Sequence, residues 1–285
     1  MDVSIIIVSY NTALLLRECL NSLRAANNME KEIFVVDNFS TDNSAAMVAE
    51  NFPEVKLIIN KENRGFGAAN NQALAQCRGR YVVFLNPDTT VNPATLQNAV
   101  AFMDANQHIG LAGAKILNPD GTTQESVSYR YPGEKFTAGE AAALPGEIAC
   151  VLGAFMIAPK RLIDELRGFD EDFFLYGEDQ DLAWRIRESG FAIGYIANAE
   201  VLHWGGQSEV GTPPVARFEK KLKAEYLFYA KHYKPETIAR IKRTQRRKAV
   251  FRLATLKIFL PFSRRKKVMQ NKFDCYRLVY KMACS

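Results

Sequence analysis

The chain has 285 residues, 48% of them hydrophobic, which fits one large globular domain, alone or followed by a tail. No apolar run approaches the ~18 residues of a membrane-spanning helix, and an acid directly after Met1 argues against a secretory signal. The net charge is +6, but residues 231–272 carry 15 Lys and Arg against one acid, Glu236, which predicts an anionic partner surface, either membrane or nucleic acid.

The first third of the chain alternates between short apolar runs and helical patterns. The runs have the length and the β-branched or aromatic character of buried strands, and they span 3–9, 32–36, 55–59 and 81–85. Residues recur at helical spacing in 14–23, 40–51 and 67–77, with Asn11-Thr12 and Ser40 or Asp42 as predicted caps. This alternation predicts an α/β fold with a mostly parallel, Rossmann-like sheet and helices on both faces.

The pattern becomes less regular in the middle of the chain. Residues 93–106 predict a helix, 110–116 a strand, and Asn118-Pro119-Asp120-Gly121 a turn. Periodicity fails from 122 to 147, where we expect a long loop, and long loops in compact domains are often functional. Ordered structure is expected again at 150–158, followed by a helix near 161–166. Five dispersed cysteines without a Cys-x-x-Cys pair predict reduced cytosolic thiols and not a disulfide framework or a zinc site.

Polar residues follow each of the four predicted strands of the first third. Ligands of open parallel sheets bind beyond the carboxyl ends of the strands, so we expect these residues to meet in one crevice. Each group alone also fits an ordinary turn or cap, but four successive strands that end this way favour a ligand site. The groups are Ser9-Tyr10-Asn11, Asp37-Asn38, residues 60–64 and Asn86-Pro87-Asp88.

The segment Arg64-Gly65-Phe66-Gly67 follows the third predicted strand and opens a helix. It lacks the third glycine of the dinucleotide-binding fingerprint and does not follow the first strand. We interpret it as a loop in which backbone and Arg64 approach a diphosphate near a helix N-terminus.

Three acids, Glu178, Asp179 and Asp181, lie at the start of a predicted helix behind an aromatic run. Acids in a first helical turn also stabilise the helix dipole, but a cluster of three offers a carboxylate as general base towards a hydroxyl. His203 follows an apolar strand, where a histidine is more often structural. With Asp88 as partner it would supply imidazole and oxygen ligands for Mn²⁺ or Mg²⁺ held also by phosphate oxygens.

Together these motifs resemble the inverting family 2 glycosyltransferases of GT-A fold, in the part that includes bacterial rhamnosyltransferases of O-antigen and cell-wall polysaccharide synthesis. The resemblance covers residues 3–208 approximately. Its most specific pieces are residues 3–11, Val35-Val36-Asp37-Asn38, Asn63-Arg64-Gly65-Phe66-Gly67, residues 84–88, and 168–182.

The resemblance implies roles for individual residues. Asp37 would accept a hydrogen bond from the pyrimidine base, Asp179 would be the catalytic base, and Asp88 and His203 would hold the metal. The residues that would bind the nucleotide-sugar donor are Ser9, Tyr10, Asn11, Asp37, Asn38, Asn63, Arg64, Gly65, Asn86 and Asp88. The residues that would contact the acceptor are Gly153, Glu178 and Trp204.

One position departs from the family pattern. Asn86 stands where the Asp-x-Asp metal motif has its first Asp, which removes a carboxylate ligand and shifts the expected donor towards dTDP-L-rhamnose and away from UDP-sugars. The implied reaction is one in-line displacement with inversion onto a glycan or lipid-linked glycan acceptor. Asp179 takes the acceptor proton, and Mg²⁺ or Mn²⁺ stabilises the departing diphosphate.

We expect a catalytic domain in 1–215, with a nucleotide-binding half (1–115) and an acceptor-binding half (116–215), and a basic helical extension in 216–285. Apolar residues interleaved with Lys and Arg predict that this extension lies on anionic membrane, which would make the protein cytoplasmic and peripheral on the cytoplasmic face. The alternative is that these residues pack on the catalytic domain. We do not expect nucleic acid as a partner.

Two other functions stay open at this stage. A sugar-phosphate nucleotidyltransferase also binds nucleotides on a parallel sheet, but it usually has a basic, glycine-rich loop after the first strand, where this chain has Ser9-Tyr10-Asn11-Thr12. A non-catalytic adaptor would work through the basic tail alone and would leave the acidic motifs without a role.

Overall fold

The computed structural model describes residues 1–26, 29–206, 209, 211–260, 263 and 265–284. The chain forms two compact units. The sheet unit comprises Met1–Tyr131 and Leu144–Ser208, and the helical unit comprises Pro132–Ala143 and Glu209–Ser285. Twelve residues from the middle of the chain therefore belong with the C-terminal helices. The boundary between a catalytic domain in 1–215 and a helical extension in 216–285 stays a prediction.

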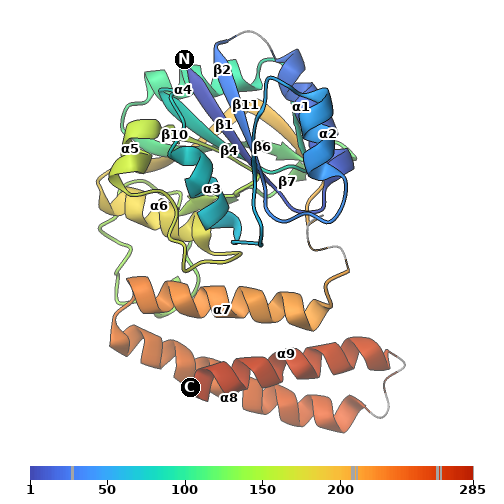
Figure 1. The fold of residues 1–285 in the computed structure, drawn as a ribbon. Coiled ribbons are helices and arrows are strands. Elements are labelled where there is room, and N and C mark those ends of the chain that lie inside the picture. Colours follow the sequence, from blue (N-terminus) through green and yellow to red (C-terminus); the bar gives the residue numbers. More distant parts are fainter. Residues whose placement is uncertain (27–28, 207–208, 210, 261–262, 264, 285) are drawn as a thin grey trace. The chain divides into compact units, whose positions relative to one another are not determined.

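One large sheet organises the sheet unit, and its strand order is β3-β2-β1-β4-β10-β6-β11-β5, with β7 paired to β6 (Figure 1). The parallel strands on one side are β1 (Val3–Ser9), β2 (Lys31–Asp37), β3 (Lys56–Ile59) and β4 (Tyr81–Leu85). The remaining strands are β5 (Thr89–Val91), β6 (Ile109–Leu117), β7 (Thr123–Gln124), β10 (Phe155–Pro159) and β11 (Ala192–His203). A small separate sheet pairs β8 (Val127–Ser128) with β9 (Cys150–Val151). The predicted α/β fold with a mostly parallel sheet is confirmed.

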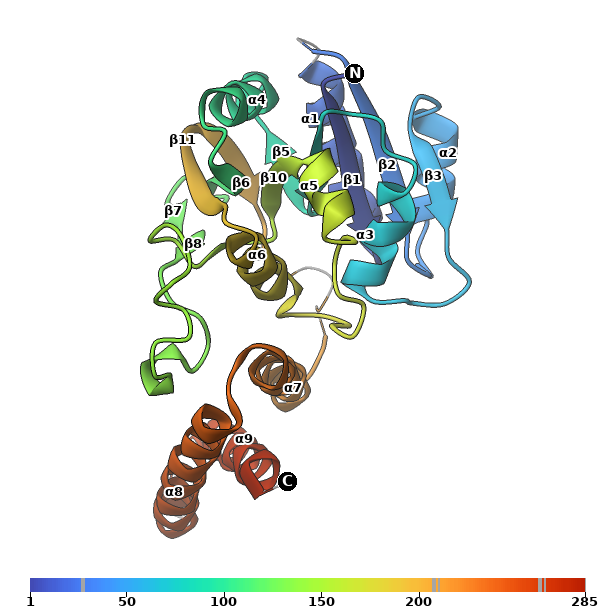
Figure 2. The ribbon, with the colours of Figure 1, turned by 90° about the vertical axis from the view of Figure 1, so that its left-hand side faces the viewer.

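Helices cover both faces of the large sheet, because β1 presents apolar residues to both sides. Ile5 and Ile7 join the core cluster that contains residues of α1 (Ala13–Ala25), α2 (Ser44–Asn51) and α4 (Thr95–Ala105). Ile6 and Val8 join the cluster that contains residues of α3 (Phe66–Leu74), α5 (Lys160–Glu165) and α6 (Glu178–Glu188). Figure 2 shows α3, α5 and α6 in front of the sheet, on the face that is turned towards the viewer. Since successive strand residues point to opposite faces, a continuous apolar run fits this two-sided burial.

The segment predicted as a long loop contains short regular elements. A turn closed by Gly121 N–H donating to Asn118 O (2.9 Å) reverses the chain after β6, so that β7 pairs antiparallel with it. β8 and the 3-10 turn η1 (Glu134–Phe136) follow. Elements of two or three residues carry too little periodicity to be predicted. The expected ordered stretch at 150–158 is likewise two strands, β9 and β10.

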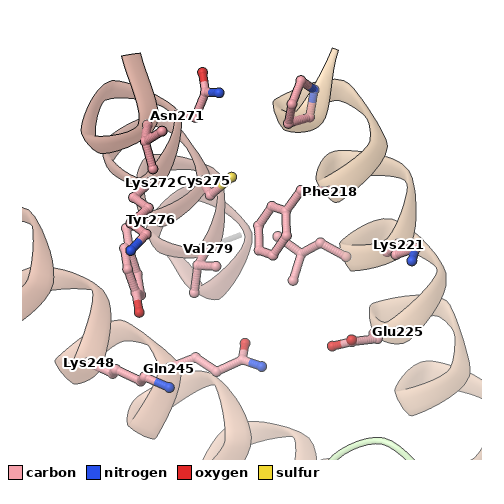
Figure 3. Close-up of a pocket in the computed structure, with 13 residues that line it drawn as sticks. Phe218, Lys221, Glu225, Gln245, Lys248, Asn271, Lys272, Cys275, Tyr276 and Val279 are labelled. Atoms are coloured by element: carbon pink, nitrogen blue, oxygen red, sulfur yellow. The ribbon is translucent and has the colours of Figure 1, made fainter. Parts of the chain in front are cut away.

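The helical unit contains α7 (Pro214–His232), α8 (Pro235–Phe259) and α9 (Lys266–Cys284). The helical unit also includes Pro132–Ala143, and this segment is joined to α8 by a hydrogen bond that Thr237 Oγ1 donates to Glu140 Oε1 at 2.6 Å. A cavity of about 620 Å³ lies between the three helices, with Phe218 and Val279 among its lining residues (Figure 3). Within the part of the chain that the structure describes, none of the helices has both the length and the apolar character needed to cross a membrane.

Candidate active site

The strand pairings bring the sequence-predicted residues to one edge of the sheet. Ser9 lies opposite Asp37 at the carboxyl ends of β1 and β2. β10 runs antiparallel to β4, so its amino end meets the carboxyl end of β4, and Asn86 N–H donates to Ala154 O at 3.0 Å. β11 runs parallel to β6 and ends at His203 on the same edge. The sheet edge to which four strand ends are predicted to contribute therefore also carries residues from two further strands.

Asp37 is almost completely buried, with 2% of its surface exposed. Its Oδ2 accepts the backbone N–H of Ser40 at 3.1 Å. Its Oδ1 is also buried and has no hydrogen-bond partner among the residues that the structure describes. Because a buried oxygen without a partner is costly, Oδ1 is poised to accept a hydrogen bond from a ligand.

The loops after β1 and β2 hold each other through Asn11. Asn11 has a left-handed backbone (φ 54°), and its Oδ1 accepts the N–H of Thr41 at 2.7 Å. The predicted cap Thr12 lies with its Oγ1 3.0 Å from Ser9 Oγ, and the N–H of Ala13 is donated instead to Asp42 Oδ2 at 2.9 Å. The Asn11 side chain therefore shapes the loop. Tyr10 between these residues is half-buried.

Asn38 fixes the loop after β3 in the same way. Its Nδ2 donates to Asn63 Oδ1 (3.0 Å) and Gly65 O (3.1 Å), and its Oδ1 accepts the backbone N–H of Arg64 (3.0 Å). The Arg64 side chain is exposed. Gly65 has a φ of +81°, and a Cβ there would lie 2.6 Å from Phe174 O, so only glycine fits. Asn38 and Asn63 thus set the path of the loop that presents Arg64.

Asp88 and His203 come together because β5 pairs antiparallel with β11. Thr89 lies opposite His203, and the N–H of Trp204 donates to Asp88 O at 3.0 Å. His203 Nε2 lies 3.3 Å from Asp88 Oδ1, with 7% of each side chain exposed. Although the two atoms are within ion-pair distance, Nε2 makes no hydrogen bond to any residue of the described ranges. On the other side of the ring, Nδ1 lies 2.9 Å from Gln124 Oε1.

This pair fits a divalent cation. A carboxylate oxygen and an imidazole nitrogen that face each other in a buried place can share a metal ion, and both ligand types suit Mn²⁺. In the described ranges, no group of three or more His, Cys, Asp and Glu side chains is placed to hold a metal. The protein would therefore supply two ligands from this set, and phosphate oxygens could supply others.

The acids at the start of α6 lie in different environments. Glu178 is buried, and burial together with the nearby charge of Asp179 raises its pKa to about 8. Burial also raises the pKa of Asp179, against the backbone N–H groups of Gln180 and Gly153, which stabilise its charged form. Asp181 instead forms an ion pair with Arg185 Nε at 2.8 Å, so its role is to stabilise the helix. A carboxylate with a raised pKa is the better general base at neutral pH.

Gly153 connects Asp179 to the sheet edge. A Cβ on Gly153 would lie 3.9 Å from Asp179 Oδ2, and the next residue, Ala154, accepts the N–H of Asn86. Trp204, half exposed, follows His203 directly and offers an aromatic face of the kind that packs on sugars. The structure therefore places Gly153, Glu178 and Asp179 together, and Asp88, His203 and Trp204 together, at neighbouring parts of one edge.

Two residues at this edge escaped the sequence analysis. Gln124 lies in a segment without periodicity, so nothing marked it out. Phe174 is 53% exposed and touches the Gly65 position, and its place in the aromatic run before Glu178 is the signal that could have found it.

Comparison with known proteins places this geometry in a family. The profile described as glycosyl transferase family 2 matches residues 4–167, more than half of the chain. The chain is 25% identical over 256 residues to the N-acetylglucosaminyl-diphospho-decaprenol L-rhamnosyltransferase of Mycobacterium tuberculosis, covering 79% of this chain and 83% of that protein. It is 34% identical over 147 residues to the succinoglycan biosynthesis protein ExoO of Rhizobium meliloti, covering 50% of this chain and 39% of that protein.

Solved structures agree in fold. The mannosyltransferase PcManGT from Pyrobaculum calidifontis, in complex with GDP-Man and Mn²⁺, superposes with a TM-score of 0.60 at 20% identity, covering 99% of this chain and 72% of that chain. Staphylococcus aureus TarS 1–349 in complex with UDP gives 0.56 at 18% identity, covering 99% and 90%. Of the functions that the sequence left open, glycosyltransferase is the one confirmed. The chain therefore belongs to glycosyl transferase family 2 and is a glycosyltransferase of GT-A fold.

Proposed function

We propose that this glycosyltransferase transfers L-rhamnose from dTDP-L-rhamnose, with inversion, to a glycan or lipid-linked glycan in bacterial surface polysaccharide synthesis. The observation that carries the catalytic part is the half-buried Asp179, whose pKa is raised by burial and which lies beside Gly153 at the sheet edge. The rhamnosyltransferase similarity and the neutral Asn86 support the donor.

In the proposed reaction, Asp179 accepts the proton of an acceptor hydroxyl as its oxygen bonds to the anomeric carbon and the bond to the diphosphate breaks. Glu178, with a pKa of about 8, holds its proton at neutral pH. Asp37 Oδ1 accepts the imide N–H of the thymine base. A divalent cation held by Asp88 and His203 would supply positive charge to the diphosphate oxygens.

The test is Asp179→Asn, which should lower transfer from dTDP-L-rhamnose by about 10²- to 10⁴-fold and leave dTDP affinity unchanged. Glu188→Gln, at the exposed end of the same helix, is the matched control and should transfer normally. The donor is tested by offering dTDP-L-rhamnose beside UDP-sugars, and inversion by NMR of the product. Wild-type turnover of Asp179→Asn would show that another group takes the proton.

We also propose that the helical unit binds anionic membrane. Phe251, Ile258 and Phe259 are each more than 60% exposed, and their spacing places them on one face of α8. Arg247, Lys248, Arg252 and Lys257 are interleaved with them, which is the composition of a helix that lies in a membrane interface. The residues that α8 buries are Thr237, Ile241 and Ala249, so the exposed Phe251, Ile258 and Phe259 are not part of its buried face.

Co-sedimentation of the full chain with vesicles containing anionic lipid tests this proposal. The double variant Phe251→Ser/Phe259→Ser should lose most of the binding at low salt. Leu14→Ser is the control: it removes an apolar residue of the sheet unit that is even more exposed, at 81%, and this variant should bind as the wild type does. Equal sedimentation of all three proteins would reject the membrane role of α8.

A further inference from the structure

Gln124 has a contact beside the candidate metal site that the proposed reaction leaves unexplained. It lies in β7, opposite Ile116 of β6, and on the other side of β6 Ile116 lies opposite Val201 of β11. β6 thus has Gln124 on one side and β11, which ends at His203, on the other. The two side chains meet at 2.9 Å between His203 Nδ1 and Gln124 Oε1, and His203 is buried.

This contact selects one tautomer of His203. The amide oxygen of Gln124 can only accept a hydrogen bond, so Nδ1 must be the nitrogen that carries the proton. In a neutral imidazole the other nitrogen, Nε2, then has a lone pair. That lone pair is on the side of Asp88 Oδ1, 3.3 Å away, and Nε2 has no hydrogen-bond partner within the described part of the chain.

The opposite tautomer has a different consequence. A proton on Nε2 could be donated to Asp88, and this hydrogen bond would occupy both proposed metal ligands. It would also place a bare Nδ1 against the Gln124 oxygen, where two lone pairs repel. With its amide oxygen towards the ring, as the structure has it, Gln124 therefore disfavours the arrangement in which His203 and Asp88 satisfy each other.

We propose that Gln124 is a positioning residue that holds His203 in the Nδ1–H tautomer, so that Nε2 and the Asp88 carboxylate are both left free for a divalent cation. The inference rests on the proposed metal role of Asp88 and His203. Metal-binding histidines commonly donate their second N–H to a fixed acceptor, and loss of that acceptor weakens metal affinity by about 10- to 100-fold.

The experiment compares Gln124→Leu, which removes the acceptor, with Gln124→Glu, which keeps one. Gln107→Leu is the matched control, because Gln107 is exposed and hydrogen-bonds to Met103 and Asp104. Imidazole ¹⁵N NMR of the metal-free full chain reads the tautomer of His203 directly, and the sequence has only 3 histidines to assign. Electron paramagnetic resonance then measures Mn²⁺ affinity in the presence of dTDP.

The wild type, Gln124→Glu and Gln107→Leu should show the Nδ1–H tautomer and similar Mn²⁺ affinity. Gln124→Leu should move the proton to Nε2 and bind Mn²⁺ about 10- to 100-fold more weakly. If Gln124→Leu keeps both the tautomer and the affinity of the wild type, the inference is wrong. It is also wrong if Gln124→Glu fails to restore either signal, since the role is then merely structural.

Failure of the metal proposal itself would look different. A wild type that binds no Mn²⁺ with dTDP would reject the roles of Asp88 and His203, while the NMR readout would still report whether Gln124 sets the tautomer. Melting temperatures confirm that each variant is folded. Gln124→Met, which keeps the length of the side chain and offers only a weak acceptor, replaces Gln124→Leu if that variant does not fold, and the same results are expected of it.

Discussion

Exchange of Asp37 for Asn should change which pyrimidine the enzyme binds. In the wild type, Oδ2 is held by the N–H of Ser40 at 3.1 Å and Oδ1 is buried without a partner in the described ranges. The Asn oxygen would take the place of Oδ2, because that position must accept the Ser40 N–H. The amide nitrogen, a donor, would then stand at the position of Oδ1, which we propose accepts the N3–H of thymine or uracil.

The size of the effect follows from this geometry. A hydrogen bond to a charged acceptor contributes about 1.5–3 kcal/mol, which corresponds to about 10- to 150-fold in the dissociation constant. Asp37→Asn should therefore weaken dTDP and UDP by at least this factor, since two donors would face each other. Cytosine has an acceptor at N3, so CDP should lose the repulsion from the carboxylate and bind the variant more tightly than the wild type.

Isothermal titration calorimetry with dTDP, UDP and CDP measures both directions in one series. Glu62→Gln, an exposed acid in the loop after β3, is the control and should leave all three affinities unchanged. Parallel melting curves show that the variant is folded. If dTDP and CDP affinities change by the same factor in Asp37→Asn, or do not change, Asp37 does not face the base edge and its assignment fails.

Three further predictions concern the rest of the site. The pKa of Glu178 rises from a model-peptide value near 4.5 to about 8 in the folded protein, which means that folding favours the protonated form. Relative to Glu178→Gln, the wild type should therefore lose stability as the pH rises between these two values, by a few kcal/mol in total. Melting curves of both proteins at pH 6 and pH 8 measure this. A stability difference between the two proteins that is the same at both pH values would contradict the prediction. Asp88→Ala and His203→Ala should each abolish the gain in donor affinity that Mn²⁺ gives, measured by calorimetry, and full activity under chelation would reject the metal role. Gly65→Ala should destabilise the protein by more than about 1 kcal/mol in urea unfolding, because its φ is +81° and a Cβ would meet Phe174 O at 2.6 Å; an unchanged midpoint would show that the loop relaxes.

The strand ends could be predicted because a strand that is buried on both faces of the sheet appears in the sequence as a continuous apolar run. All seven residues of β1 are buried, and an apolar run bounded by polar residues marks both the strand and the place where it ends. The same signal located Ser9, Asp37 and Asn86. The ends of strands can therefore be predicted from sequence when the strands are central and parallel.

The hydrogen bonds that the polar side chains of the site make to neighbouring loops could not be predicted. Asn11 and Asn38 are expected to contact the donor, which stays a prediction, and their amide groups also hydrogen-bond to neighbouring loops. Which partner an amide takes depends on loops far apart in sequence. The contact of His203 with Gln124 joins residues separated by 79 positions, and β7, which brings them together, has only two residues.

The first turn of α6 shows how environment divides roles among identical chemical groups. Glu178, Asp179 and Asp181 all stand where the helix dipole favours a negative charge. Arg185 neutralises Asp181 one helical turn away, and this pair also anchors the preceding loop through Arg185 bonds to Leu166 O and Gly168 O. Burial raises the pKa of both Glu178 and Asp179, and the backbone N–H groups of Gln180 and Gly153 stabilise the charged form of Asp179. Asp179 must be ionised to act as a general base, and a raised pKa then strengthens its affinity for the proton of the acceptor.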